Sequence, residues 1–452
     1  MSKKSLPGVH VPHFKHTEEC APVRMPVPAK VEISLSQHLG APADPTVNVG
    51  DYVKVGQKIG DSQAFMFAPI HSSVSGKVVG FGQIMNFIGM PLKTVIIETD
   101  GKQVVHESVQ PPTVTNKAEF IAALKECGLV GLGGATFPAH IKFNVKDEDN
   151  IDSLILNGAE CEPYLTSDYR TMIDRTEDIM DGIRAIQKYL GIKNVYIAIE
   201  DNKPKAIEKL RQAAGNDASI HVCPLEAKYP KGGEKITIFE TTGRTVKEGK
   251  LPSHEGCILS NITSVATIGS YLRTGMPLVE KCLTVDGTAV AEPKNVIAPI
   301  GTYYKDIFSF CGGYKEEPKK LIAGGLMMGV TQPSDTMPVQ KGNNGILALG
   351  ASEIDTDPAT ECIRCGKCVR ACPMSLMPVY IDKAYQANRI DEMRSLKPTL
   401  CLNCGCCSFS CPAKRPLTYT VQRAKFAVIA ANRADAEKAK AEAEKKAAAE
   451  KK

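Results

Sequence analysis

Near its C-terminus this chain carries two sets of four cysteines with the same spacing. Each set reads Cys-x-x-Cys-x-x-Cys-x-x-x-Cys, and a proline, Pro373 or Pro412, follows the last cysteine of each set. The two sets are Cys362, Cys365, Cys368 and Cys372, and Cys401, Cys404, Cys407 and Cys411. Thiols placed in this way predict bound iron–sulfur clusters, through which electrons pass one at a time.

The spacing is that of the two-cluster bacterial ferredoxin run, in which three close cysteines ligate one [4Fe–4S] cluster and the distant fourth ligates the other. We therefore expect Cys411 to complete the cluster of the first set, and Cys372 to complete the cluster of the second. A pair of zinc sites is the alternative, because zinc sites also use Cys-x-x-Cys pairs. A zinc site, however, needs only four thiolates per ion. A third cysteine at the same spacing, followed by a Cys-Pro pair, is therefore not expected for zinc.

Cysteine usage and composition narrow the class of protein. The first residues, MSKKSLPGVH, lack an apolar signal-peptide core, and the clusters need reduced thiolates, so we expect a reducing, cytoplasmic compartment. No run approaches 18 apolar residues, and no membrane span is expected. A net charge of +5 over 452 residues argues neither for nor against a nucleic-acid partner. Only 6% of the residues are aromatic and there is no Trp, so we expect no base-stacking surface and no nucleic-acid partner. We interpret the eight remaining cysteines as buried free thiols.

The N-terminal third predicts a small all-β unit after an irregular start. Residues 1–24 are rich in Pro and His, and residues 25–110 alternate short apolar stretches with glycine. The phrases VGDYVKVGQKIG and APIHSSVSGKVVG resemble the barrel-sandwich fold of biotinyl and lipoyl carriers. Those carriers present a lysine at a tight turn, whereas the corresponding SQAFMFAPI has none, so we expect the fold without the swinging arm.

The middle of the chain predicts a parallel sheet. Residues 117–127 place Phe120, Ile121 and Leu124 on one helical face, and Gly128 follows as a stop signal. From about residue 150 the order is strand, amphipathic helix, strand, helix and strand. This βαβαβ order predicts a Rossmann-like arrangement.

A glycine-rich loop, GLGGATFPAHIKF over 131–143, lies before the first of these strands. Glycine lets backbone N–H groups approach a flat ring or a phosphate closely, and Lys142 adds positive charge. An ordinary tight turn is the alternative reading of this loop alone. The strand 152–158, however, runs into the polar cluster NGAECEPY, and ligands of open α/β sheets bind outside the carboxyl ends of strands.

Together with KYPKGGE at 228–234 and LSNIT at 259–263, these segments resemble the NADH-binding flavoprotein subunit of respiratory complex I, which holds FMN and stacks NADH over it. The resemblance implies FMN and NAD(H) sites at the matching positions. Phe137 matches an aromatic that lies against the nicotinamide nucleotide. The implied cofactor-binding residues are Gly131, Gly133, Gly134, Phe137, Lys142, Asn157, Glu160, Glu162, Tyr229, Gly232, Glu234 and Asn261.

Over about residues 5–420 the chain, with its Gly-x-His-x-Pro start at Gly8, resembles the C subunit of the Rnf-type complex, a membrane ferredoxin:NAD oxidoreductase that translocates Na⁺ or H⁺. The resemblance implies a multidomain α/β fold. Its expected parts are an irregular segment plus barrel-sandwich at 1–110, a Rossmann-like FMN/NADH domain at 111–282, a β-grasp soluble-ligand-binding segment at 283–345 and a two-[4Fe–4S] ferredoxin-like helical domain at 346–420. The composition predicts an Ala/Lys-rich, solvated helical tail at 421–452, outside the resemblance.

The expected function is electron transfer between NADH, FMN and the two clusters, because a flavin can join hydride transfer to one-electron carriers. Expected partners are NADH and the other subunits of the complex, with ferredoxin reached indirectly, on the cytoplasmic face of the membrane. One alternative is a flavin and iron–sulfur subunit of a soluble NAD-linked hydrogenase or formate dehydrogenase. Another is an electron relay without flavin, against which the four FMN-like segments argue.

Overall fold

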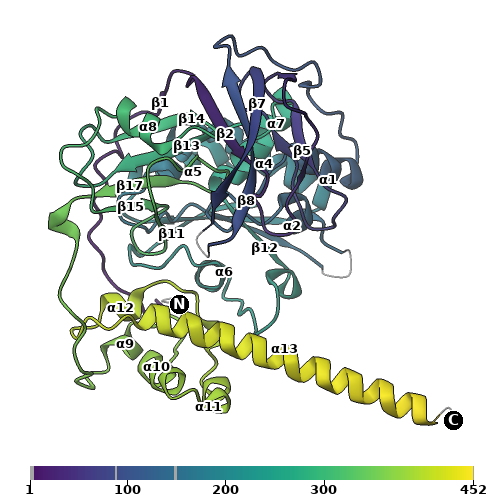
Figure 1. Ribbon diagram of the computed structural model, residues 1–452. Coiled ribbons are helices and arrows are strands. Elements are labelled where there is room, and N and C mark those ends of the chain that lie inside the picture. Colours follow the sequence, from purple (N-terminus) through teal and green to yellow (C-terminus); the bar gives the residue numbers. More distant parts are fainter. Residues whose placement is uncertain (1–4, 87–88, 147–149, 451–452) are drawn as a thin grey trace.

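The computed structural model describes residues 5–86, 89–146 and 150–450, which form four packed units and an irregular N-terminal segment (Figure 1). The first three units lie together, and the helical C-terminal unit lies below them in the view, with one long helix extending past it. The mixed α/β, multidomain fold predicted from the sequence is confirmed.

The first unit is the predicted all-β barrel-sandwich. Its inward-facing side chains alternate along the strands, so that Val31, Ile33, Val95 and Ile97 are fully buried in one core. One sheet has the order β2-β8-β7-β4 and the other β3-β5-β6. The strands are β2 (Lys30–Ser34), β3 (Asp44–Pro45), β4 (Tyr52–Val53), β5 (Lys58–Asp61), β6 (Ile70–His71), β7 (Gly76–Met85) and β8 (Pro91–Thr99).

The second unit contains the predicted parallel sheet, with strand order β11-β10-β9-β12. Its strands are β9 (Ser153–Asn157), β10 (Asn194–Glu200), β11 (Ile220–Leu225) and β12 (Cys257–Asn261). Fully buried Leu154, Leu156 and Ile197 join the helices in one large core. The carboxyl ends of β9 and β12 lie side by side, because Asn157 and Asn261 are register partners.

Helices surround this sheet, and capping residues mark their ends. Asn116 caps the first helix by accepting from Glu119 N–H at 3.0 Å, and Gly191 ends the fourth in the left-handed region at φ 68°. The helices are α1 (Lys117–Glu126), α2 (Ala139–Phe143), α3 (Ser167–Asp174), α4 (Thr176–Leu190), α5 (Pro204–Ala214), α6 (Glu234–Thr242), the 3₁₀ helix η2 (Pro252–Glu255) and α7 (Ile262–Thr274).

The third unit is a mixed sheet of order β1-β14-β13-β17-β15-β16. Its edge strand β1 directly follows the N-terminal segment and pairs with β14 in parallel, with Val23 opposite Val296. β17, the last strand of this unit along the sequence, ends at Leu349, beyond the boundary at residue 345 that we expected for the unit. The elements are β1 (Val23–Arg24), β13 (Glu280–Asp286), β14 (Lys294–Pro299), α8 (Tyr304–Phe310), β15 (Lys320–Ala323), β16 (Val330–Gln332), β17 (Gly345–Leu349) and η3 (Ala351–Glu353).

The fourth unit carries both cysteine sets on short helices and turns. Its longest helix, α13, starts inside the unit. The first part of this helix is buried in the unit through Leu417, Val421, Ala424 and Val428, whereas residues 432–444 are exposed. The predicted solvated helix is therefore confirmed for that exposed part. The elements are α9 (Lys367–Arg370), α10 (Pro378–Gln386), α11 (Ile390–Ser395), η4 (Pro398–Leu400), α12 (Cys406–Phe409) and α13 (Leu417–Glu450).

The N-terminal segment, residues 5–22, binds the units together. Val9 N–H donates to Tyr229 O at 2.8 Å, Tyr164 N–H donates to His13 O at 3.0 Å, and Asn295 Nδ2 donates to Thr17 O at 2.9 Å. These contacts reach the second and third units. Val11 packs against side chains of the fourth unit.

Of the eight cysteines outside the two sets, four are buried, so the prediction of buried thiols holds for half of them. The buried ones are Cys127, Cys257, Cys311 and Cys406, and the half-buried ones are Cys161, Cys223 and Cys282. Cys20 is exposed, because it lies in a turn of the N-terminal segment on the surface.

Candidate flavin and iron–sulfur sites

The glycine-rich loop closes on itself in front of α2. Gly131 N–H donates to Phe137 O at 2.9 Å, and Thr136 N–H returns to Gly131 O at 3.2 Å. Gly133 and Gly134 lie at the exposed tip, and Gly134 has φ 101°, a value that favours glycine. The tip therefore presents bare backbone, as a flavin-binding loop requires.

This loop meets the carboxyl edge of the parallel sheet. A Cβ added to Gly133 would lie 3.5 Å from Asn261 Cβ, which places the loop tip beside the end of β12. Lys142 Nζ donates to Leu259 O at 2.9 Å and lies 3.6 Å from Glu234 Oε1. The predicted flavin segments thus come together where ligands of open parallel sheets bind.

The loop at 228–234 lies on the other side of Asn157. Asn157 Nδ2 donates to Gly232 O at 2.8 Å, and Gly232 N–H donates to Cys161 Sγ at 3.3 Å. The four segments that the sequence places far apart therefore form one candidate site. The assignment of individual residues to FMN and NADH stays a prediction.

Two of the predicted carboxylates already have partners inside the protein. Glu160, in the left-handed region at φ 48°, accepts from Asp168 N–H at 2.6 Å and Tyr169 N–H at 3.0 Å, at the start of α3. Glu162 accepts from Met327 N–H at 2.8 Å. Burial raises the pKa of both carboxyl groups. Glu234, whose side chain is 44% exposed, is the predicted carboxylate that faces open space.

Asn261 also has a structural role. It caps α7 by accepting from Thr263 N–H at 2.9 Å, and its Nδ2 donates to Asp168 Oδ2 at 2.7 Å. Burial raises the pKa of the Asp168 carboxyl. Asp168 was not among the residues predicted from the sequence, because a polar residue at the start of a helix has many ordinary roles.

Lys15, a residue of the N-terminal segment, was not predicted either. Its Nζ donates to Glu160 O at 2.9 Å and to Glu162 O at 2.8 Å, and burial lowers the pKa of its ammonium group. Lys15 thereby fixes the backbone of the strand-end segment that follows β9. A single lysine in an irregular stretch gives no sequence signal for such a contact.

The eight predicted ligand cysteines gather in the fourth unit, and their grouping fits the crossed arrangement. Cys372 lines one cavity together with Cys401, Cys404 and Cys407. Burial, with a contribution from the neighbouring thiols of Cys401, Cys404 and Cys372, raises the pKa of the Cys407 thiol to about 12. Cys406 also lines this cavity. The four cysteines that keep the repeated spacing fit a [4Fe–4S] cluster with one cysteine for each iron.

The other four thiols lie nearer the surface. Burial raises the pKa of the Cys368 thiol and the nearby Cys411 adds to the shift, which places these two close together. Cys365 is exposed, and Cys362 and Cys411 are half-buried. Within the described residues, no three His, Cys, Asp or Glu side chains converge on a position for a single metal ion. Ligands of a cubane need no such convergence, because each binds a different iron.

The two sites touch at Tyr229. Its side chain is 2% exposed, and its hydroxyl donates to Cys404 O at 2.7 Å. A Cβ added to Gly233 would lie 3.3 Å from Leu402 Cδ1, so the neighbouring residues of both loops are also in contact. The cluster pocket of Cys401, Cys404, Cys407 and Cys372 is therefore the one that lies against the flavin loops.

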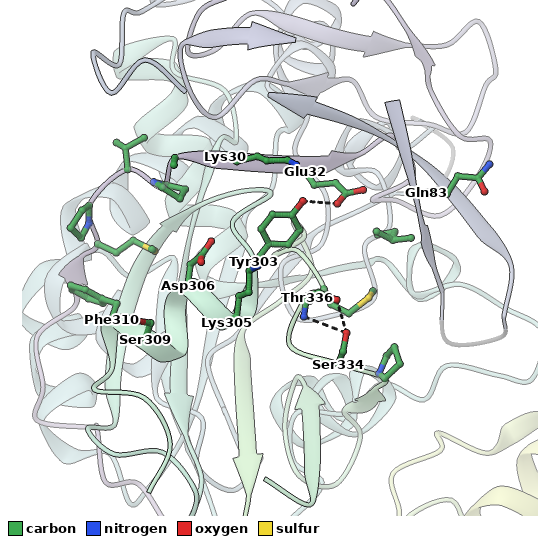
Figure 2. Close-up of a pocket in the computed structure, with 18 of the residues that line it drawn as sticks. Lys30, Glu32, Gln83, Tyr303, Lys305, Asp306, Ser309, Phe310, Ser334 and Thr336 are labelled. Carbon is green, nitrogen blue, oxygen red and sulfur yellow. Dashed lines mark hydrogen bonds between the residues drawn. The ribbon is translucent and has the colours of Figure 1, made fainter. Parts of the chain in front are cut away.

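A separate open hollow of about 930 Å³ lies between the barrel-sandwich and α8 (Figure 2). Tyr303 projects into it and donates to Glu32 Oε2 at 2.8 Å, with Lys30 and Lys305 nearby. None of the predicted flavin or cluster residues lines this hollow. The described helices include none long and apolar enough to cross a membrane.

Four protein-family models match successive parts of the chain. They are the RnfC Barrel sandwich hybrid domain over residues 4–102, the Nuo51 FMN-binding domain over 124–270, the SLBB domain over 283–331 and the 4Fe-4S dicluster domain over 361–414. These matches confirm the predicted architecture and the predicted cofactors, FMN and two [4Fe–4S] clusters.

Curated relatives cover most of the chain. The C subunit of a proton-translocating ferredoxin:NAD(+) oxidoreductase complex from Clostridium ljungdahlii is 42% identical, over 84% of this chain and 83% of the relative. The C subunit of a Na(+)-translocating ferredoxin:NAD(+) oxidoreductase complex from Acetobacterium woodii is 40% identical, over 94% and 97%. The C subunit of an ion-translocating oxidoreductase complex from Rhodobacter capsulatus is 39% identical, over 85% and 75%.

Among solved structures, an NAD+-reducing [NiFe]-hydrogenase in the air-oxidized state overlays only in part, with a TM-score of 0.47 and 15% identity over 62% of this chain and 54% of the hydrogenase chain. The curated relatives do not favour the alternative of a soluble hydrogenase or formate dehydrogenase subunit. At 39–42% identity over most of its length, the chain belongs to the family of C subunits of ion-translocating ferredoxin:NAD(+) oxidoreductase complexes.

Proposed function

We propose that this chain is the NAD-active subunit of a ferredoxin:NAD oxidoreductase that translocates Na⁺ or H⁺, and that it carries electrons between NADH and its partner subunits. The contact between the flavin loops and the second cysteine set, through Tyr229 and Cys404, carries the proposal. FMN, when bound, supplies the chemistry that joins two-electron hydride transfer to one-electron carriers.

Different residues of the chain have different roles around the flavin. The exposed glycines at 133 and 134 let the ring or phosphate approach the backbone, and Lys142 supplies positive charge for the phosphate or for the reduced flavin. Glu234, beside Lys142 and exposed, accepts hydroxyl or amide hydrogen bonds from the nucleotide, and its charge disfavours the additional phosphate of NADP. Glu160 and Glu162 act by holding the strand-end segment in place.

The packing implies an order for the clusters. The pocket of Cys372 and the second cysteine set lies against the flavin loops, whereas the first set has an exposed member, Cys365. Electrons therefore pass between the flavin and the second-set cluster, and leave or enter the chain through the first-set cluster.

The surface at the first set fits a protein partner with an acidic face. Ile363 is 68% exposed, and Arg364 and Lys367 are exposed and form no ion pair with any acidic side chain of the described residues. A hollow beside Cys362 is lined by Val379 and Lys383, and also by Glu361 and by Asp382, which is paired with Arg415 at 2.8 Å. We place here the docking site of another subunit's one-electron carrier, with the chain held peripherally on the cytoplasmic face of the membrane.

The test is anaerobic mixing of the purified chain, loaded with FMN and iron–sulfur clusters, with NADH. NADH should bleach the flavin absorbance first and the cluster absorbance afterwards, and NADPH should act much more slowly. An intact flavin that NADH does not reduce would overturn the proposal. For the docking site, Lys367→Glu together with Arg364→Glu should release the chain from native membranes at lower salt than the wild type. Unchanged retention would remove this surface from the proposal.

A further inference from the structure

Tyr229 lies at the junction of the two redox sites. Its ring belongs to a small apolar cluster with Val11 of the N-terminal segment and with Ala371, Cys404 and Cys406 of the fourth unit. Its backbone exchanges two hydrogen bonds with Val9: Val9 N–H donates to Tyr229 O at 2.8 Å, and Tyr229 N–H donates to Val9 O at 3.0 Å. The side chain is therefore held by three parts of the chain that are far apart in sequence.

The direction of its hydrogen bond follows from the chemistry of the acceptor. The oxygen of Cys404 is a peptide carbonyl and can only accept, so the Tyr229 hydroxyl directs its single hydrogen at it across 2.7 Å. Glu162 Oε1 lies farther from the hydroxyl, at 3.4 Å. The positive end of the O–H dipole thus points at the main chain of a predicted cluster ligand.

The loop that carries Tyr229 also reaches the flavin site. Gly232, three residues on, accepts from Asn157 at the end of β9, and Glu234 lies beside Lys142. Gly233 contacts Leu402 of the second cysteine set. One short loop therefore contacts the candidate flavin site on one side and the cluster ligands on the other.

We infer that Tyr229 is a positioning residue for electron transfer: it fixes the second-set cluster against the flavin loop, and its hydroxyl favours the reduced state of that cluster. This inference rests on the proposed function. A reduced cluster carries one more negative charge, so the positive end of a buried O–H dipole beside its ligands favours that state. Outer-shell hydrogen bonds that hold the ligands in place also tune the properties of a metal site. In the step itself one electron moves from the NADH-reduced flavin to the cluster, no bond forms or breaks, and the hydroxyl keeps its proton.

The resemblance noted from the sequence assigns Tyr229 to the flavin itself, and the two roles predict different results. If the hydroxyl served the flavin, its removal would release FMN and leave both clusters unchanged. If it serves the cluster, its removal leaves FMN bound and changes one cluster of the two.

The experiment uses the full chain loaded with FMN and clusters and the variant Tyr229→Phe, which removes the hydroxyl and keeps the ring. Both cluster potentials are measured by redox titration with electron paramagnetic resonance, using dithionite as the reductant. Cys365→Ser assigns the signal of the first-set cluster. Tyr304→Phe is the matched control, because Tyr304 is a buried tyrosine hydrogen-bonded to Asn343 in the third unit.

In Tyr229→Phe we expect the second-set cluster to become harder to reduce. At a fixed potential its ratio of reduced to oxidised form should fall by about two- to tenfold, the usual range for one hydrogen bond. The first-set cluster, the FMN content and both potentials of Tyr304→Phe should stay unchanged. After rapid mixing with NADH, the flavin should bleach at the wild-type rate and the cluster should follow more slowly.

Two unchanged cluster potentials, an equal shift of both, or loss of FMN from Tyr229→Phe would each overturn the inference. Should Tyr229→Phe fail to assemble its clusters, Gly233→Leu tests the same junction, because its side chain would meet Leu402 and separate the two loops. A wild-type chain whose flavin NADH does not reduce would refute the proposed function alone, since the titration with dithionite still decides the role of Tyr229.

Discussion

Asn157 and Asn261 stand opposite each other at the last paired position of the neighbouring parallel strands β9 and β12. Asn157 reaches across to Gly232, and Asn261 lies beside Gly133. Two short polar side chains at one sheet edge thus bring together the glycine-rich loop and the loop that contacts the clusters. The following predictions test the sites that they join.

The tip of the glycine-rich loop has room for a side chain in the protein alone. Gly133 has no left-handed backbone conformation, and a Cβ there meets nothing closer than 3.5 Å. Gly133→Val should therefore fold, with a change in unfolding free energy of about 0.5 kcal/mol or less, and should lose FMN. Flavin fluorescence after acid extraction and thermal unfolding measure the two effects. Gly182→Ala is the contrast, because its Cβ would lie 2.1 Å from Val265 O and should destabilise the fold while sparing the loop. Full flavin in Gly133→Val would mean that the loop is only a turn.

Lys142 should be needed for flavin affinity. Its loss removes a charged hydrogen-bond donor, worth about 1.5–3 kcal/mol, so Lys142→Met should raise the Kd for FMN by about 10- to 150-fold. Lys235→Met is a suitable control, since Lys235 also donates to a backbone carbonyl, that of Val246, and is predicted to have no ligand role. Titration of flavin-free protein with FMN gives both constants, and equal affinities in the two variants would contradict the role of Lys142.

Glu234 should act on the nucleotide and not on the flavin. Glu234→Gln should raise the KM for NADH in ferricyanide reduction, with FMN still bound, and should narrow the preference for NADH over NADPH. Glu162→Gln should change the KM little, because its carboxylate already binds Met327 N–H. If Glu162→Gln raised the KM and Glu234→Gln did not, the nucleotide would be bound by the carboxylates at the end of β9 and not by Glu234.

The crossed ligation predicts which cluster each cysteine serves. Cys372→Ala should remove the cluster of the second set, with which Cys372 shares a cavity, and leave the cluster of Cys362, Cys365 and Cys368. Iron content should fall by about half, from two four-iron clusters to one. Cys406→Ala, at the buried cysteine out of step with the set, should keep both. Loss of only the first-set cluster in Cys372→Ala would refute the crossing.

Three buried histidines should make the fold sensitive to acid. His38 and His71 of the first unit and His140 of α2 each have an Nδ1 without a hydrogen-bond partner in the described part of the protein. Burial lowers the pKa of His38 and His140 to about 4 and that of His71 well below its ordinary value. Nearby Lys341, Lys125 and Lys58 add to these shifts.

Because the folded state keeps these rings neutral while the unfolded chain protonates near pH 6.5, their contribution to stability is present above pH 6.5 and is lost as the pH falls towards 4. Thermal unfolding followed by circular dichroism should show that the unfolding temperature falls between pH 6.5 and pH 4. The double variant His38→Gln, His140→Gln should show a smaller fall of the unfolding temperature over the same range. The exposed His221→Gln serves as control. An unchanged slope in the double variant would remove these histidines as its cause.

Much of the fold followed from local patterns. The βαβαβ order, the capping signals and the spacing of the cysteines act over short distances, so each could be predicted from neighbouring residues. The clusters followed for the same reason, because the ligands of one set lie within a dozen residues.

What could not be predicted depends on contacts between distant segments. Glu160 and Asn261 matched cofactor-binding motifs, yet their oxygens cap α3 and α7, and only the packed structure shows which N–H groups they meet. Tyr229 likewise matched a flavin motif, and its partner, Cys404 O, lies 175 residues away. Lys15 and β1 gave no signal, because Lys15 contacts a loop and β1 pairs with β14, both far along the chain.

The N-terminal segment has a consequence for the order of assembly during synthesis. Val11 leaves the ribosome well before its packing partners Ala371 and Cys404, which lie far along the chain. At about 5–20 residues per second, some 20–80 seconds separate them. The segment can complete its packing against the second cysteine set only after that set has emerged, so residues that are made early take part in a late step of folding.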